Sequence, residues 1–255
     1  MKIYKHDYNL AEMKKLFPDL RTICIVGRPG AGKSTLAARA GDQIPANVCR
    51  LDVPLFEVYD TTPELLKKLY NVEELPCTKD GHKLHSFHAK YAHRDKETFR
   101  NFIKIARPHI ENRLCEEILK RQSEMRTENP LQDTSWGDKE FVYTPTNMIK
   151  RNTFIMDGFS PGRSVLASAD KVYICSTYTA EVANNAAANR EKKDTPTELE
   201  EFLRGIQVAG EVIEETLHED LRGLEYVQIV NNHGGQKEMD KLVRRIVKDY
   251  HHDIF

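Results

Sequence analysis

The chain has 255 residues, with 38 Lys and Arg against 39 Asp and Glu, so its formal net charge is −1. Hydrophobic residues make up 40% and charged residues 30% of the chain, which excludes a collagen-like or wholly disordered protein. The balanced charge argues against a protein that coats nucleic acid through a general positive field, and the length is enough for one sizeable core.

The apolar runs are short, as in 23–26, and fall far below the roughly 18 residues that span a bilayer. Residues 1–7 lack the apolar core and cleavage site of a secretory signal. We therefore expect a cytoplasmic protein with no membrane partner. The five cysteines contain no Cys-x-x-Cys pair, which indicates neither a disulfide framework nor a zinc ribbon; three of them lie in apolar runs and are expected to be reduced core residues.

Short apolar or β-branched runs alternate with helical patterns, which predicts an α/β fold of three layers around a parallel sheet. The expected strands are 22–26, 47–51, 153–156, 171–176 and 225–230. The expected helices are 33–40, 63–70, 96–106, 109–125, 179–189, 197–217 and 236–249. Residues 1–20 form an extension, with a short helical pattern at 9–17, and 21–255 form the main domain. The polar stretch 127–151 predicts an insertion or a mobile loop.

A glycine-rich motif joins the first expected strand to the first expected helix. Residues 27–34 read Gly-Arg-Pro-Gly-Ala-Gly-Lys-Ser, the G-x-x-x-x-G-K-[ST] pattern whose backbone N–H groups bind phosphate oxygens. Lys33 is expected to bridge the β- and γ-phosphates of ATP, and Ser34 to bind Mg²⁺. The alternative is a glycine-rich turn without a ligand. The predicted nucleotide-binding residues are Gly27, Arg28, Pro29, Gly30, Ala31, Gly32, Lys33, Ser34 and Thr35.

A second acidic partner for the metal is expected where another core strand ends. Asp157 follows the apolar run 153–156 and precedes a glycine. A carboxylate in this place would position Mg²⁺ through water. The alternative is an aspartate that caps the following turn.

Two sets of motifs carry a resemblance to known families. Residues 25–35 and 155–159 resemble the matching motifs of adenylate kinase and the other nucleoside monophosphate kinases, although Ser-Pro-Gly-Arg at 160–163 replaces the family's Pro-Arg. The middle of the chain resembles dephospho-CoA kinase and uridine kinase. The segments that carry this second resemblance are 48–52, 80–81, 99–105, 107–110 and 229–234.

These resemblances imply a P-loop kinase fold and several functional parts. They imply a helical acceptor lobe at about 53–126 and a mobile lid at about 190–196, in which Arg190 would neutralise charge in the transition state. An ordinary charged loop is the alternative for the lid. The dephospho-CoA kinase resemblance implies that Asp52 ends the second strand as a catalytic carboxylate; the alternative is a surface or helix-capping aspartate.

Asp52 bears on the acceptor because only a hydroxyl acceptor needs a base to take its proton. An acceptor phosphate is already ionised near neutral pH, so Asp52 favours an alcohol.

One face of the helix expected at 96–106 is basic and the other is apolar. This basic face could hold phosphates already present on the acceptor; the alternative is a solvated face paired with Asp95 and Glu97. The cations proposed for acceptor binding are Arg94, Lys96, Arg100, Lys104 and Arg107.

Histidines crowd one stretch of this lobe, at His85, His88 and His93. Without a cysteine pair or a His-Glu-x-x-His pattern, the sequence favours a solvated histidine-rich loop over a zinc site.

The sequence thus predicts an ATP- and Mg²⁺-dependent kinase acting on a hydroxyl of a nucleotide-like, phosphate-bearing acceptor. Dephospho-CoA, a nucleoside or nucleotide, and a hydroxymethylated base in DNA all fit, although the net charge weakens the nucleic-acid option. The alternatives are a nucleoside monophosphate kinase and a regulatory P-loop ATPase. The sequence does not indicate the oligomeric state.

Overall fold

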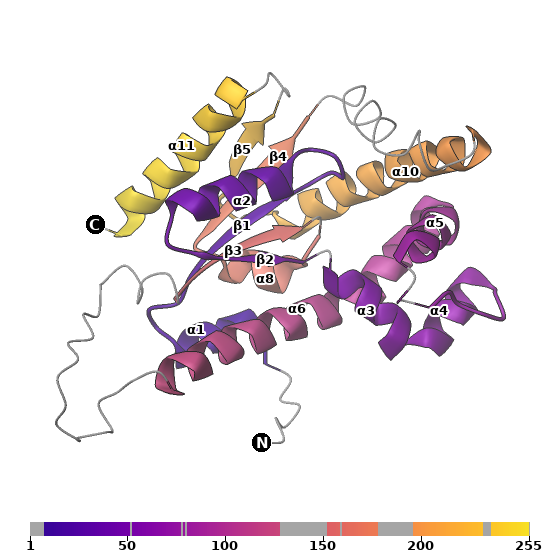
Figure 1. Cartoon of the computed structure of the whole chain (residues 1–255), viewed down its shortest axis with the longest axis horizontal. Helices are drawn as coiled ribbons and strands as arrows, with labels where there is room; N and C mark the ends of the chain where they lie inside the picture. The colour runs from indigo at the N-terminus through magenta and orange to yellow at the C-terminus, as the bar shows by residue number, and fades with distance from the viewer. Residues whose placement is uncertain are drawn as a thin grey trace.

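The structure is a computed structural model that describes residues 8–51, 53–77, 79, 81–127, 152–158, 160–177, 196–231 and 236–254. The strands are β1 Arg21–Gly27, β2 Asn47–Arg50, β3 Thr153–Gly158, β4 Lys171–Ser176 and β5 Val227–Val230 (Figure 1). The helices are α1 Leu10–Leu16, α2 Lys33–Gln43, α3 Val53–Thr61, α4 Pro63–Tyr70, α5 Gly81–Tyr91, α6 Lys96–Thr127, α8 Arg163–Ser168, α10 Pro196–Asp220 and α11 Gln236–Ile254.

The five strands form one sheet in the order β2-β3-β1-β4-β5, and every pair is parallel. β1 and β3 lie at the centre, and six of the seven residues of β1 and all six of β3 are buried. Such continuous burial is typical of a parallel sheet covered on both faces. Because the strands are parallel, their carboxyl ends meet at one edge, where Gly27 is in register with Cys175 and Arg50 with Asp157.

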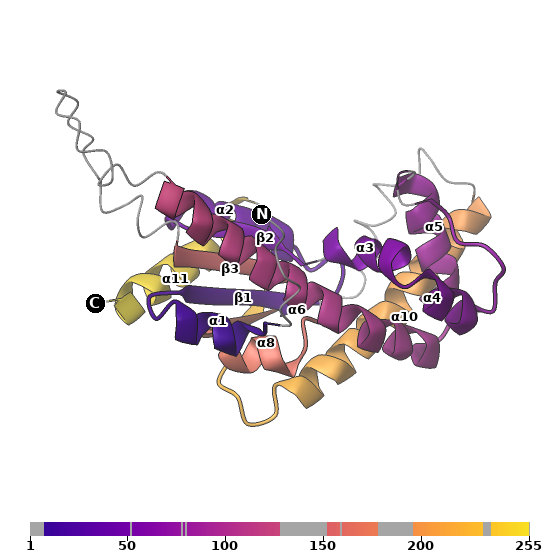
Figure 2. The ribbon, with the colours of Figure 1, turned by 90° about the horizontal axis from the view of Figure 1, so that it is seen from below.

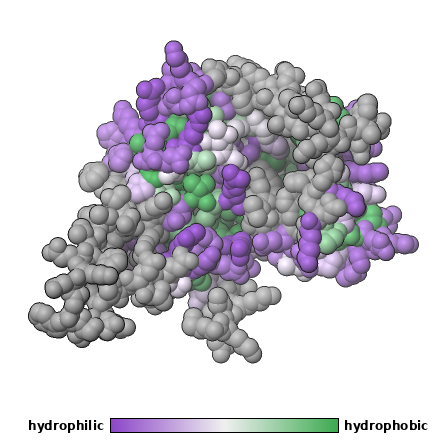
Figure 3. All heavy atoms as spheres, viewed as in Figure 1, coloured by the Kyte–Doolittle hydropathy of each residue, from purple (hydrophilic) through white to green (hydrophobic). Residues whose placement is uncertain are grey.

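Helices cover both faces of the sheet, and alternate strand residues point into two cores. Ile25 and Ile155 pack with α2 and α11 on one face. Cys24 and Met156 pack on the opposite face, which α1, α6, α8 and α10 cover (Figure 2). On the side of the molecule seen in Figure 3, hydrophilic side chains make up most of the visible described surface, with hydrophobic patches between them. The fold is therefore the three-layer α/β arrangement that the sequence predicts.

A helical lobe built from α3, α4, α5 and the first part of α6 extends beyond the sheet (Figures 1 and 2). Its interior is aromatic, and Tyr59 lies at the centre. The Tyr59 hydroxyl is 2.6 Å from Nδ1 of His88 and 3.1 Å from the hydroxyl of Tyr70. These polar groups satisfy one another inside the lobe, as buried polar groups must. The lobe lies within the range predicted for acceptor binding.

The solvated histidine loop predicted from the sequence is wrong for two of its three histidines. His88 lies on α5 and is 8% exposed. His93 follows that helix and packs against α10, where a Cβ on Gly205 would lie 3.2 Å from the Cβ of His93. No group of metal-ligating side chains suited to a metal ion lies within the described part of the chain.

Sequence patterns place the strands within two residues of their observed bounds, but some helices differ. The separate helices expected at 96–106 and 109–125 are wrong: they form one helix, α6, with Pro108 inside it. Helices α3, α5 and α8 were not predicted. The short N-terminal helix is confirmed, and Asn9 and Glu12 cap it reciprocally. Cys24 and Cys175, which lie in apolar runs, are buried as predicted for core residues, whereas Cys49 is only partly buried. Cys115 is buried as well.

The expected helix 179–189 and nearly all of the stretches 127–151 and 190–196 lie outside the described residues. Among the described helices, none has the length and apolar character needed to cross a membrane.

We expect His93 to make the protein less stable in acid. Its Nδ1 is buried with no hydrogen-bond partner among the described residues, and burial lowers the pKa of its imidazole from 6.5 to about 4. Below pH 6.5 the unfolded chain binds this proton and the folded chain does not, so protonation favours unfolding. We expect the free energy of unfolding to fall by up to about 3 kcal/mol between pH 6.5 and 4 from this group.

The measurement is urea unfolding of the wild type and of His93→Leu across this pH range. The variant should lack this part of the pH dependence. His251→Leu, which removes an exposed histidine, is the control. Identical pH profiles for the wild type and His93→Leu would contradict the assignment.

Candidate active site

The glycine-rich loop between β1 and α2 is shaped by close contacts at the edge of the sheet. Gly27 has a φ of 145°, and a Cβ there would lie 2.0 Å from the carbonyl oxygen of Cys175 on β4. Gly32 caps α2 with a φ of 82°, a left-handed conformation that favours glycine. The loop therefore turns from strand to helix within a few residues, and the first N–H groups of α2 are left for a ligand.

Lys33 is the first residue of α2, and its side chain points back to the loop. It is only 6% exposed, and its Nζ donates to the carbonyl of Arg28 at 2.7 Å. The N–H of Ala31 also donates to this carbonyl, at 3.3 Å. The ammonium group is thus held over the loop, where phosphate oxygens would meet it.

The side chain of Arg28 extends away from the loop to α10. Its Nη1 is 3.4 Å from Oε1 of Glu214, and a Cβ on Gly210 would lie 2.7 Å from its Nη2. Residue 28 can therefore contribute its backbone to a phosphate site, while its guanidinium ties the loop to α10. Pro29 and Ser34 are partly exposed on the loop and at the start of α2, and Thr35 is exposed.

Asp157 lies at the end of β3, fully buried next to the loop. Neither carboxylate oxygen has a hydrogen-bond partner of normal geometry among the described residues. Burial raises the pKa of this carboxyl, and the neighbouring Ser34 hydroxyl and the charges of Lys33 and Arg50 oppose the shift. A buried carboxylate is costly unless a cation pairs with it.

The surroundings of Asp157 fit Mg²⁺. This ion prefers oxygen ligands and usually takes only one or two carboxylates, with water and substrate phosphates completing its shell. Ser34 and Asp157 are the two residues that would hold it, one through its hydroxyl and the other through its carboxylate.

Two predicted catalytic residues, Asp52 and Arg190, lie outside the described residues. Leu51 is described, and its N–H donates to the carbonyl of Asp157 at 2.7 Å. The end of the second strand therefore meets the same edge of the sheet as the glycine-rich loop.

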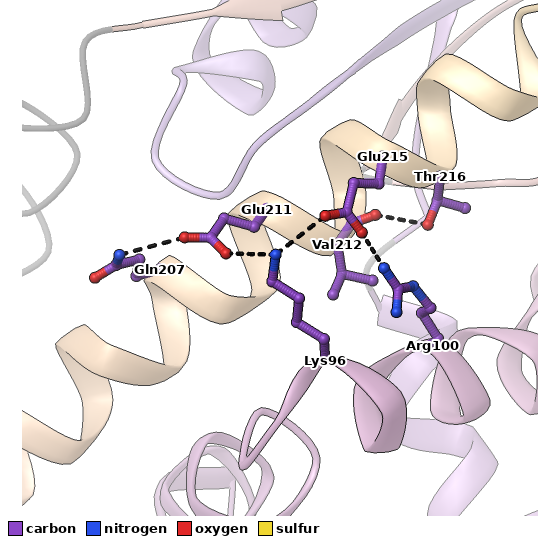
Figure 4. A network of polar contacts seen from close by, with 7 residues as sticks. All are labelled: Lys96, Arg100, Gln207, Glu211, Val212, Glu215 and Thr216. Atoms are coloured by element: carbon purple, nitrogen blue, oxygen red, sulfur yellow. Dashed lines mark hydrogen bonds and ion pairs between the residues drawn. The ribbon is translucent and has the colours of Figure 1, made fainter.

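The predicted basic face lies on α6, but α10 neutralises much of it (Figure 4). Lys96 lies 2.8 Å from Glu211 and 3.1 Å from Glu215, and Arg100 also pairs with Glu215. The hydrogen bonds and charges of Lys96 lower the pKa of both glutamates. The partners expected from the sequence were different, because α10 was not placed beside α6.

The remaining predicted acceptor cations have separate contacts. Arg94 pairs with its neighbour Asp95 at 3.0 Å. Arg107 donates to Ser160 Oγ at 2.7 Å and pairs with Asp220 at the end of α10. Lys104 has no carboxylate partner within the described part of the chain. It lines a cavity of about 460 Å³ together with Arg107.

Arg163 has a structural contact in place of the phosphate contact of the nucleoside monophosphate kinases. Its Nη1 donates to the carbonyls of Asp220 and Arg222, at 2.8 and 2.9 Å, and so caps the end of α10. This use of Arg163 agrees with the departure of residues 160–163 from that family's motif.

Sequence reasoning missed the side chains that support the loop from neighbouring elements. These are Glu214 on α10, Cys175 on β4 and Asn231 after β5. The only available signal was that parallel strands end at one edge of the sheet, which places Cys175 and Asn231 near the loop.

No protein-family model matches the sequence, and no curated protein matches it. The solved structure of TT1252 from Thermus thermophilus superposes with a TM-score of 0.51 at 17% identity, covering 92% of this chain and 98% of that one. The chain therefore shares the overall fold of that structure.

Two further solved structures align over similar spans. Dephospho-CoA kinase from Campylobacter jejuni has a TM-score of 0.44 at 14% identity, covering 92% of this chain and 98% of its own. Shikimate kinase from Acinetobacter baumannii, in complex with shikimate, has a TM-score of 0.39 at 12% identity, covering 94% and 98%.

Replacing Asp157 with Asn separates stability from metal binding. Asp157→Asn keeps the shape of the side chain and removes a buried charge, so the metal-free variant should be at least as stable as the wild type at pH 7. Phosphoryl transfer should fall by about 100-fold or more because the metal loses a ligand.

The measurements are urea unfolding without metal, and the rise in thermal midpoint on adding Mg²⁺ and ATP. The rise should shrink in the variant. A variant that gains the full stabilisation from Mg²⁺ and ATP would contradict the metal assignment.

Proposed function

We propose that the protein is an ATP- and Mg²⁺-dependent kinase that transfers the γ-phosphoryl group of ATP to a hydroxyl on a nucleotide-like acceptor that already carries phosphate. The observation that carries this proposal is the buried carboxylate of Asp157 beside Ser34, for which no hydrogen-bond partner is found among the described residues. Ser34 and Asp157 would hold Mg²⁺, which would supply positive charge to the phosphates of a bound nucleotide.

Each residue of the loop has a separate task in this mechanism. The backbone N–H groups of 27–34 bind phosphate oxygens, and Lys33 neutralises the charge that develops between the β- and γ-phosphates. Mg²⁺, when bound, stabilises the negative charge of the transferring group. Burial of Lys33 and Asp157 excludes water from the reacting phosphate and strengthens these interactions.

The acceptor side of the proposal depends on Asp52 and Arg190. Asp52 accepts the proton of the acceptor hydroxyl. The preceding residue, Leu51, donates its N–H to the carbonyl of Asp157. Arg190 belongs to a lid that closes over ATP and neutralises transition-state charge. The capping role of Arg163 supports an acceptor site unlike that of nucleoside monophosphate kinases.

Lys96 and Arg100 are the cations proposed to hold the acceptor's own phosphate. Their ion pairs with Glu211 and Glu215 are exposed, and exposed pairs of this kind contribute little to stability. A phosphate dianion competes well for such cations because charge-assisted bonds to Arg and Lys are stronger. The α10 carboxylates hold these side chains in place until the acceptor arrives.

Lys33→Ala should reduce transfer of labelled γ-phosphate from ATP by about 1,000-fold or more without unfolding the chain. The panel of acceptors is dephospho-CoA, nucleosides, nucleoside monophosphates, and DNA with and without hydroxymethylated bases. Lys248→Ala, an exposed lysine on α11, is the control and should keep full activity. Transfer retained by Lys33→Ala would refute the kinase assignment.

The acceptor class follows from the same panel with Asp52→Asn. A labelled alcohol product that this variant fails to form supports the hydroxyl mechanism. Label on nucleoside monophosphates alone, unaffected by Asp52→Asn, would indicate a nucleoside monophosphate kinase instead. Free phosphate from every mixture would indicate a regulatory ATPase.

Removal of the α6 cations should weaken acceptor binding selectively. Lys96→Ala and Arg100→Ala should each raise the KM for the acceptor by about tenfold and leave the KM for ATP unchanged. Glu215→Gln removes the carboxylate partner of Arg100 and one of the two partners of Lys96, and should lower the acceptor KM. Arg113→Ala, which removes an exposed arginine on the same helix, is the control. If the acceptor KM is the same in all these variants, Lys96 and Arg100 do not bind the acceptor and their role is structural.

A further inference from the structure

The carbonyl group of Ala31, in the middle of the glycine-rich loop, has two side-chain donors from distant parts of the chain. Nδ2 of Asn231 lies 2.9 Å from this oxygen, although the two residues are 200 positions apart. Sγ of Cys175 lies 3.0 Å from the same oxygen. Both donors are buried, Asn231 with 1% and Cys175 with 1% of its surface exposed.

The direction of this carbonyl determines the direction of the next N–H. In a trans peptide the C=O and N–H groups point in opposite directions, and none of the peptide bonds among the described residues is cis. The Ala31 carbonyl points to the ends of β4 and β5. The Gly32 N–H therefore points away from these strand ends. Among the described residues no acceptor takes a hydrogen bond from Gly32 N–H, so it is available to a phosphate oxygen.

We propose that Asn231 and Cys175 are positioning residues that hold the Ala31–Gly32 peptide with its N–H directed at the phosphates of ATP. This inference rests on the proposed function for its ligand, but the peptide orientation is a property of the ligand-free protein. A loop peptide without these donors can rotate, and a rotated peptide presents a carbonyl oxygen to the phosphates. The resulting repulsion would weaken nucleotide binding.

Two further contacts support a positioning role for Asn231. Its own N–H donates to the carbonyl of Ser176 at 2.8 Å, so its backbone is held to the end of β4. A Cβ on Gly32 would lie 2.4 Å from its Nδ2. The amide therefore reaches the loop only because residue 32 is glycine.

Cys175 is suited to act as a donor because burial raises the pKa of its thiol to about 11. The sulfur therefore keeps its proton at neutral pH. Its backbone already touches the loop, where Gly27 lies against its carbonyl oxygen. Cys175 thus contacts the loop twice. Its carbonyl oxygen lies against Gly27 at the beginning of the loop, and its thiol donates to the carbonyl of Ala31 in the middle.

The test uses near-isosteric variants of the full chain. Asn231→Leu removes the donor without adding charge, and Asn231→Asp removes it while adding one. Cys175→Ala removes the thiol, whereas Cys175→Ser restores a donor in the same place. Calorimetry measures the Kd of ATP and of adenosine, and the ¹³C resonance of the Ala31 carbonyl in the ligand-free protein reports on its hydrogen bonds.

We expect Asn231→Leu and Asn231→Asp to bind ATP about tenfold more weakly or worse, with unchanged affinity for adenosine. Cys175→Ala should lose about threefold, and Cys175→Ser should recover most of this loss. The Ala31 carbonyl resonance should move in every variant that lacks a donor and return in Cys175→Ser.

Each contrary result has a separate meaning. A wild-type protein that fails to bind ATP would overturn the proposed function, and the Ala31 resonance would still decide the peptide orientation. An unmoved resonance in Asn231→Leu would overturn the inference. Weaker ATP binding in Asn231→Asp alone would also overturn it, because the added charge would then be the cause.

Discussion

The candidate site depends on the close approach of β1 and β4 at their carboxyl ends. Gly27 and Cys175 are in register there, and only a glycine leaves room for the Cys175 carbonyl oxygen at 2.0 Å from a Cβ position. This contact brings the end of β4 directly against the loop. The Ala31 carbonyl then accepts from Cys175 and Asn231, while the Gly32 N–H has no acceptor among the described residues, which is the geometry that an anion needs.

Buried charge is the second constraint on this site. Lys33 and Asp157 are both buried at the sheet edge, and each would be costly there without a partner of opposite charge. Lys33 donates to the Arg28 carbonyl, and its charge acts on Asp157, whose oxygens have no hydrogen-bond partner among the described residues. In the proposed function, phosphate and metal are the further partners of these two charges.

Helix α10 connects the two halves of the molecule through successive carboxylates. Glu214 reaches the loop through Arg28, Glu211 and Glu215 hold α6, and Asp220 pairs with Arg107 beyond them. Glu211 and Glu215 share a face because they are four residues apart, and Glu214, beside Glu215, pairs with Arg28 of the loop. A shift of α10 would therefore change the ion pairs of Arg28 in the loop and of Lys96 and Arg100 in the helical lobe.

The sequence alone determined the parallel sheet, the phosphate loop and the position of Asp157, because strand periodicity, glycine conformation and strand-end chemistry are local properties. It did not determine that α6 is one continuous helix through Pro108, that His88 is buried and His93 partly buried, or that α10 neutralises Lys96 and Arg100. It also gave no sign that Asn231 and Cys175 meet at the carbonyl of Ala31. These features join residues far apart in the chain, and only tertiary packing decides which of them come within contact distance.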